Sequence, residues 1–113
     1  MSASPRRARG TIRLVALDRV AVLLSMQRAL WEQVTPNLRA VTVDLHDGHA
    51  VAARFLYDGP IGEVERECTS LAEAYCIADM PPDVSVTFSA VERAARDLLP
   101  GEEWVYMRHE ADG

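Results

Sequence analysis

The fold is decided by the stretch VTVDLHDGHAVAARFLY, residues 41–57. Apolar and polar residues alternate on both sides of Asp47-Gly48, a pattern typical of two half-buried strands. An Asp-Gly pair between two alternating runs is the strongest local hairpin signal, because both turn residues tolerate positive φ. We therefore expect strands over residues 38–45 and 51–57, paired antiparallel.

Amphipathic helices are predicted on both sides of this hairpin. Asp18 is a good N-cap, and Pro36 disfavours helical geometry at residue 35, so the first helix should end near Val34. Its inner stripe is expected to be Val20, Leu23, Leu24, Gln27, Leu30, Trp31 and Val34. The second helix should run from about residue 61 to residue 79. Its inner stripe is expected to be Ile61, Val64, Cys68, Leu71, Ala72, Tyr75 and Cys76.

Two further strands are predicted over residues 84–90 and 104–109, while residues 91–99 fit either a short helix or an irregular crossing. The element order is α-β-β-α-β-β. It predicts an α+β two-layer sandwich, with a four-stranded, mostly antiparallel sheet and two helices on one face. The other face should show these side chains to water: Thr42, Arg54, Ser85, Thr87 and Ser89.

The chain is acidic overall, but its charge is unevenly distributed. Its 113 residues include 12 arginines, no lysine and 17 acids, for a net charge of −5. Residues 1–10 read as a disordered basic tip of charge +3, residues 11–110 as a single domain, and residues 111–113 as a frayed end. The remaining −8 argues against nucleic-acid binding. Arginine without lysine, beside abundant alanine, indicates a GC-rich bacterial genome.

Charged residues interrupt the apolar run over residues 12–30, which argues against a secretory signal or a membrane span and favours a cytoplasmic protein. Cys68 and Cys76 lie about 12 Å apart if both are on one helix, too far for a disulfide. Cys68 is expected to fill the core.

Catalytic groups are hard to find in this sequence. His46, His49 and Asp44 could form a metal site only if the fold supplied further ligands, and no CxxC, HExxH, GxSxG or glycine-rich phosphate motif is present. We therefore predict a non-enzymatic protein with no catalytic residue, no metal and no cofactor. A metal-dependent enzyme built on these three residues is the minor alternative.

Acidic residues gather on the second predicted helix. Glu63, Glu65, Glu67 and Glu73 could form a docking face for a basic protein partner, with Trp104 as an aromatic contact. The alternative for these acids is a solvated surface that keeps a small protein soluble. A second alternative for the protein is a homodimeric scaffold or regulator that pairs through its fourth strand.

Several runs resemble small, uncharacterised, acidic bacterial proteins of the toxin-immunity kind. These are residues 27–41 (QRALWEQVTPNLRAV), 57–60 (YDGP), 78–79 (AD) and 101–110 (GEEWVYMRHE). The resemblance covers most of residues 17–110. It implies an immunity or antitoxin-like inhibitor that binds and blocks a toxin, and it transfers no catalytic motif.

Overall fold

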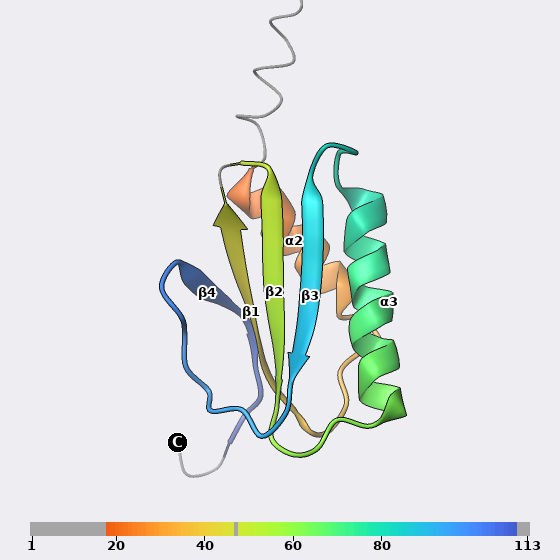
Figure 1. Cartoon of the computed structure of the whole chain (residues 1–113), viewed down its shortest axis with the longest axis vertical. Coiled ribbons are helices and arrows are strands. Elements are labelled where there is room, and N and C mark those ends of the chain that lie inside the picture. Colours follow the sequence, from red (N-terminus) through yellow and green to blue (C-terminus); the bar gives the residue numbers. More distant parts are fainter. Residues whose placement is uncertain (1–17, 47, 111–113) are drawn as a thin grey trace, which may run out of the picture.

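The computed structural model describes residues 18–46 and 48–110. The predicted basic tip (1–10) and frayed end (111–113) lie outside the described residues. In chain order the elements are helix α2 (Arg19–Ala29), strands β1 (Leu38–His46) and β2 (Ala50–Tyr57), helix α3 (Glu63–Asp79), and strands β3 (Ser85–Val91) and β4 (Glu102–Met107) (Figure 1). Two helices and one four-stranded sheet make the described residues an α+β structure, as predicted.

The predicted hairpin is present. β1 and β2 pair antiparallel, with Val43 opposite Ala53 and His46 opposite Ala50. Gly48 has φ 69°, a left-handed conformation that glycine adopts without the steric cost of a Cβ atom. The Asp-Gly pair therefore predicted this turn correctly, because its glycine takes the left-handed conformation that the turn requires.

The sheet is mixed, so the prediction of a mostly antiparallel sheet was wrong. Its strand order is β3-β2-β1-β4, with β1 antiparallel to both neighbours and β2 parallel to β3. Parallel neighbours need a long crossover, and α3 provides it. Its 17 residues span about 25 Å, close to the roughly 26 Å of the eight-residue β2, so the helix returns the chain to the level where β2 began.

One hydrophobic core joins both helices to one face of the sheet. It includes Val22 and Met26 of α2, Ala72 of α3, and the inward side chains of Val43 and Phe55. Figure 1 shows α2 passing behind the strands and α3 lying along the β3 side. The Phe55 and Phe88 rings lie 5.5 Å apart, which closes the core below α3.

The inner stripe predicted for the first helix was wrong in part: Leu30 is buried and Leu23 packs against the core. The buried residues of the helix are Val22, Ser25, Met26 and Ala29, whereas Val20, Leu24 and Trp31 are exposed. The helix also ends at Ala29 rather than near Val34, because the chain turns and Glu32 adopts φ 67°. Apolar residues occupy both sides of this helix, so periodicity alone could not select the buried side.

The inner stripe predicted for α3 was also wrong in part. Thr69, Ala72 and Cys76 are buried, but Val64, Leu71 and Tyr75 are exposed. Small side chains at the buried positions let the helix lie close to the sheet, and the larger apolar residues remain on its flank. Cys76 rather than Cys68 is the buried thiol, since Cys68 is only half-buried.

The second face of the sheet is partly covered by residues 92–101, which run from β3 to β4 as an irregular crossing with no helix. Ala94 packs on Ala40 and Leu56 in a small second cluster. Thr42, expected to face water, is fully buried on this side. The prediction failed there because the crossing and β4 exclude water from this position.

Arginine side chains from the sheet hold the crossing in place. Arg39 donates to the carbonyl of Ala94 at 3.0 Å, and Arg54 donates to the carbonyl of Asp97 at 3.1 Å. Arg54 also makes two bonds, at 2.7 and 2.6 Å, to Glu102, whose carboxylate is nearly buried. These bonds lower the pKa of Glu102 below its ordinary value. Paired arginine-carboxylate geometry is strong and directional, so the crossing is fixed at both ends.

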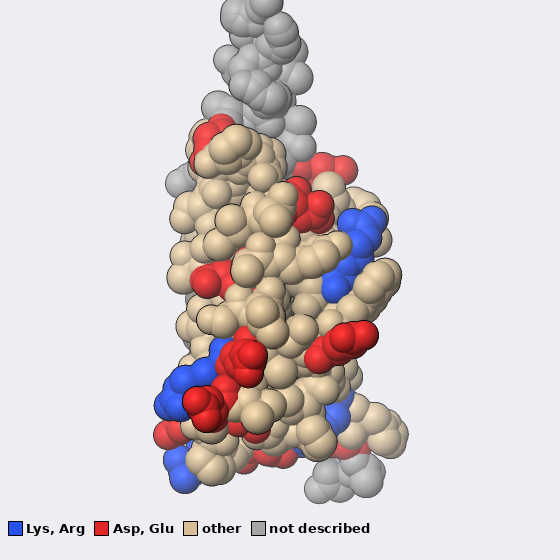
Figure 2. Space-filling model, turned by 90° about the vertical axis from the view of Figure 1, so that its right-hand side faces the viewer, with Lys and Arg blue, Asp and Glu red and all other residues tan. Residues whose placement is uncertain are grey.

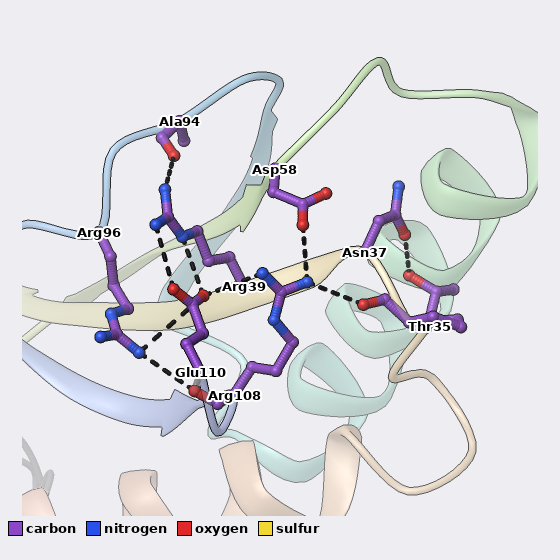
Figure 3. Close-up of polar contacts among 9 residues, drawn as sticks. Thr35, Asn37, Arg39, Asp58, Ala94, Arg96, Arg108 and Glu110 are labelled. Atoms are coloured by element: carbon purple, nitrogen blue, oxygen red, sulfur yellow. Dashed lines mark hydrogen bonds and ion pairs between the residues drawn. The ribbon is translucent and has the colours of Figure 1, made fainter. Parts of the chain in front are cut away.

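A second arginine cluster holds the last described residue (Figure 3). Arg39 bonds both carboxylate oxygens of Glu110 at 3.0 and 3.1 Å, and Arg108 reaches the same carboxylate at 2.9 Å. Arg108 also pairs with Asp58 at 2.7 Å, and Arg96 lies 4.0 Å from Glu110. The hydrogen bonds from Arg39 are the main cause that lowers the pKa of Glu110 from 4.5 to about 2.

We predict that Glu110→Gln lowers the urea concentration of half-unfolding at pH 7, because the arginines lose their carboxylate. A carboxyl whose pKa is depressed on folding contributes stability above its unfolded pKa and loses it as the pH falls. The difference between wild type and variant should therefore shrink between about pH 4.5 and pH 2. Glu67→Gln is the control, since Glu67 is exposed and has no arginine partner among the described residues. An equal pH dependence of Glu110→Gln and wild type would contradict the prediction.

Candidate protein interface

The start of α3 is fixed by its own acids. The side chain of Glu65 accepts a hydrogen bond from the backbone amide of Gly62 at 2.7 Å, which satisfies one of the free amides at the helix start. Bonds from the backbone amides of Glu65 and Gly62 lower the pKa of Glu65. Glu63 in the first turn is also favoured by the helix dipole.

The structure divides the four predicted contact glutamates into two pairs. Glu63 and Glu67, one turn apart, are exposed on the outer side of α3. Glu65 is half-buried as the capping residue. Glu73 is half-buried and accepts a hydrogen bond from the backbone amide of Phe88 on β3 at 2.9 Å. Glu63 and Glu67 are therefore the two glutamates most open to a partner.

Trp104, the predicted aromatic contact, does not lie beside these acids. It is half-buried on the sheet face opposite the helices, packed against Ala40, Leu56 and Ala94. It also belongs to β4, at the edge of the sheet remote from β3 and α3. Trp31 is instead 72% exposed, in the turn after α2. The exposed tryptophan of the described residues is therefore Trp31, on the helical side.

Most of the positive charge is already paired. Seven of the eight arginines in the described residues lie within 4.0 Å of an acid; Arg66 on α3 is the eighth. Nine acids in the same residues have no arginine within that distance, and four of them are on α3: Glu63, Glu65, Glu67 and Glu73. Helix α3 thus carries four of the nine unpaired acids of the described residues, together with the unpaired Arg66.

Apolar surface fills much of the space between these charges. Figure 2, which looks onto the α3 side, shows acidic side chains as separate patches among uncharged ones, with arginine beside some of them. The largest exposed apolar side chains of the two helices are Val20, Leu24, Trp31, Val64, Leu71, Tyr75 and Ile77. The helical side therefore combines exposed apolar side chains with separate acids and the exposed Arg28 and Arg66, rather than forming a continuous acidic face.

In the predicted histidine site, only one of the two histidines lies close to an acid. Nε2 of His46 lies 3.0 Å from the Asp44 carboxylate, while His49 is exposed in the turn. Within residues 18–46 and 48–110, no three histidine, cysteine or acidic side chains gather as metal ligands would. Burial raises the pKa of both thiols, Cys68 and Cys76, which favours their protonated form.

Side chains from the helices occupy both edges of the sheet. Glu73 binds the amide of Phe88 on β3, and the side-chain amide of Gln27 donates to the carbonyl of Val105 on β4 at 2.7 Å. Such contacts blunt strand edges that could otherwise pair with another chain. The homodimer through the fourth strand stays a prediction, and it would require the Gln27 bond to break.

The described part of the chain contains no pocket. None of its helices is both long and apolar enough to cross a membrane. Two helices and one four-stranded sheet thus make the described residues a small α+β domain.

Residues 19–110 match the model of the MafI2 immunity protein family, and the chain belongs to that family. No curated protein matches the chain. The resemblance to toxin-immunity proteins inferred from the sequence is thereby confirmed.

The two tryptophans should be distinguishable by fluorescence. Trp104→Phe leaves the exposed Trp31, so its emission should lie at longer wavelength and be quenched more strongly by acrylamide. Trp31→Phe leaves the half-buried Trp104 and should give the opposite result. Acrylamide is the suitable quencher because it is uncharged and is not repelled by the acids. Equal quenching of the two variants would contradict the different environments of these residues.

Proposed function

We propose that this chain is a non-enzymatic immunity protein that neutralises a basic toxin by binding it. Membership of an immunity protein family supports a protein partner of this kind. The contact side we propose is the outer side of α3, led by Glu63 and Glu67. Glu65, Glu73 and Trp104, predicted as contacts from the sequence, have mainly structural environments, so we give them smaller roles.

The observation that carries the proposal is the unpaired charge of α3. Six of the eight described arginines pair with acids outside α3, while Arg28 pairs with its Asp79 and Arg66 lies between Glu65 and Glu67, so the helix keeps more negative than positive charge. Opposite potentials on two proteins accelerate their encounter and select between partners. A toxin that acts on an acidic substrate would present such a basic surface, and covering that surface would block access to its site.

We also propose that the protein acts in the bacterial cytoplasm. Its two cysteines are free, and on one helix they lie too far apart to pair. Free thiols suit a reducing compartment. An immunity protein in this place would meet toxin that reaches the cytoplasm or is made there.

A charge-neutralising pair of variants tests the proposal. The probe is a candidate toxin chosen from the genes that neighbour the gene of this chain, with toxicity measured as growth arrest in a host bacterium and binding measured with an inactivated form. Glu63→Gln/Glu67→Gln should lower the association rate constant by about three- to tenfold at low salt, because it removes charge that steers the encounter. The effect should fade as salt is raised, since salt screens exposed charges.

The matched control is Asp83→Asn/Asp97→Asn, which removes the same charge from exposed residues outside α3. It should change the rate constant by less than about twofold. Equal slowing by both double variants would show that net charge alone matters, and it would contradict α3 as the contact side. Failure of wild type to bind the toxin or to restore growth would overturn the proposed function itself.

A further inference from the structure

Both helices expose the apolar residues that sequence periodicity assigned to the core. The α2–α3 apolar face, as we name it, consists of Val20, Leu24 and Trp31 from the α2 side and Val64, Leu71 and Tyr75 from α3. Scattered exposed apolar residues are common, but contiguous apolar surface on a small protein marks an interaction site. The question is whether these six side chains lie together.

Helix periodicity and one ion pair bring part of this set together, at the C-terminal ends of the two rows, whereas Val20 and Val64 begin the rows near the other ends of the helices. Val64, Leu71, Tyr75 and Asp79 follow one another at spacings of seven, four and four, so they form one row along α3. Val20, Leu24 and Arg28 follow at spacings of four along α2. Arg28 lies 3.8 Å from Asp79, so the two rows meet at this pair. Leu24 and Tyr75 are each one turn before it.

A buried contact confirms that the two helices are adjacent here. The hydroxyl of Ser25 lies 3.8 Å from the sulfur of Cys76, and each residue is three positions before the members of the Arg28–Asp79 pair. The rows therefore flank the seam between the helices. Trp31 follows two turns after Leu24, just beyond the end of α2, and is the most exposed large apolar side chain of the described residues.

The charges around this face favour a basic partner over a second copy of the chain. Glu63 and Glu67 stand beside Val64 on α3, and Glu32 adjoins Trp31; the arginines on these helices near the face are Arg28, paired with Asp79, and the exposed Arg66. The described residues hold fifteen acids and eight arginines. A two-fold dimer joins the same surface of both copies and would bring these acids face to face. A basic partner would instead pair with them around the apolar centre.

We infer that the α2–α3 apolar face is the centre of the toxin-binding surface, with Trp31 inserted into an apolar pocket of the toxin that is bordered by basic residues. This rests on the proposed function and assigns the contacts that hold the complex. Large aromatic residues at the centre of an interface dominate its affinity, whereas surrounding charges mainly affect the rate of encounter. The exposed glutamates are thus expected to affect the association rate, and the apolar face the dissociation rate.

The test compares dissociation rates of the full-length chain from the inactivated neighbouring toxin. Trp31→Ala should raise the dissociation rate constant at least about 30-fold, as expected for a central aromatic contact. Leu71→Ala should raise it about fivefold or more. Leu99→Ala is the matched control, because Leu99 lies on the crossing and is 52% exposed, compared with 48% for Leu71. It should leave the rate constant within about twofold of wild type.

The exposed positions of these residues keep the variants foldable, and the urea midpoint of each should stay close to that of wild type. Trp31→Phe should recover most of the binding lost in Trp31→Ala. If Trp31→Ala and Leu71→Ala dissociate like wild type while Glu63→Gln/Glu67→Gln still associates slowly, the inference is overturned and the proposed function stands. If wild type does not bind the toxin, the proposed function fails, and the inference fails with it.

Two alternatives to the toxin could cover this face: a second copy of the chain, or another part of the same chain. Acrylamide quenching of Trp104→Phe, measured without toxin over a range of protein concentrations, tests both. Strong quenching at every concentration is expected for an open face, and addition of the toxin should suppress it. Quenching that falls as protein concentration rises would identify a second copy as the occupant. Weak quenching at every concentration would identify another part of the same chain as the cover. Either of these two results overturns the inference.

Discussion

The parallel pairing of β2 with β3 is the constraint on which the rest of the structure depends. It requires α3 as a crossover, and it leaves the end of β3 at one side of the sheet while β4 must join β1 at the other. Residues 92–101 therefore have to cross the open face without secondary structure of their own. Buried backbone in such a segment needs hydrogen-bond partners, and arginines 39 and 54 supply them. Those same arginines pair with Glu110 and Glu102.

This use of arginine has an electrostatic consequence far from the crossing. Three of the eight described arginines, Arg39, Arg54 and Arg108, lie on the sheet or just after β4 and pair with acids there. Helix α3, on the other side of the molecule, keeps four glutamates and only Arg66 against them, besides the Asp79 that pairs with Arg28. Arg39 and Arg54 thus lie where the irregular crossing needs hydrogen-bond donors, and α3 is left with an excess of acids.

The sequence revealed the elements more reliably than their orientation. Asp47-Gly48 predicted the hairpin, since its turn chemistry is local. The buried sides of the helices could not be chosen, because α2 is apolar on both sides and because α3 packs through Ala72 and Cys76 rather than through its larger residues. The parallel β2–β3 pair depends on tertiary packing, and the alternation of apolar and polar residues does not indicate whether neighbouring strands run parallel or antiparallel.

The candidate site was only partly visible for a related reason. The acids of α3 stand out in the sequence, but which of them are free depends on Phe88 and Gly62, their hydrogen-bond partners. The arginine clusters join residues that are far apart in the sequence, such as Arg39 and Glu110, and no local sequence pattern predicts these pairs. Trp31 looked like a core residue because it continues an apolar stripe, whereas the helix ends two residues before it.

Two apolar sides on α2 have a physical implication for any complex. A helix that is apolar on both sides is ordinarily buried on both, and α2 buries only Val22, Met26 and Ala29 against the sheet while Val20 and Leu24 face outward. Burying the outward side would remove apolar area from water without disturbing the core, because the core contacts belong to other residues. Such a surface can gain affinity for a partner at little cost to the stability of the free protein. The acids near this surface then restrict the gain in affinity to partners of opposite charge.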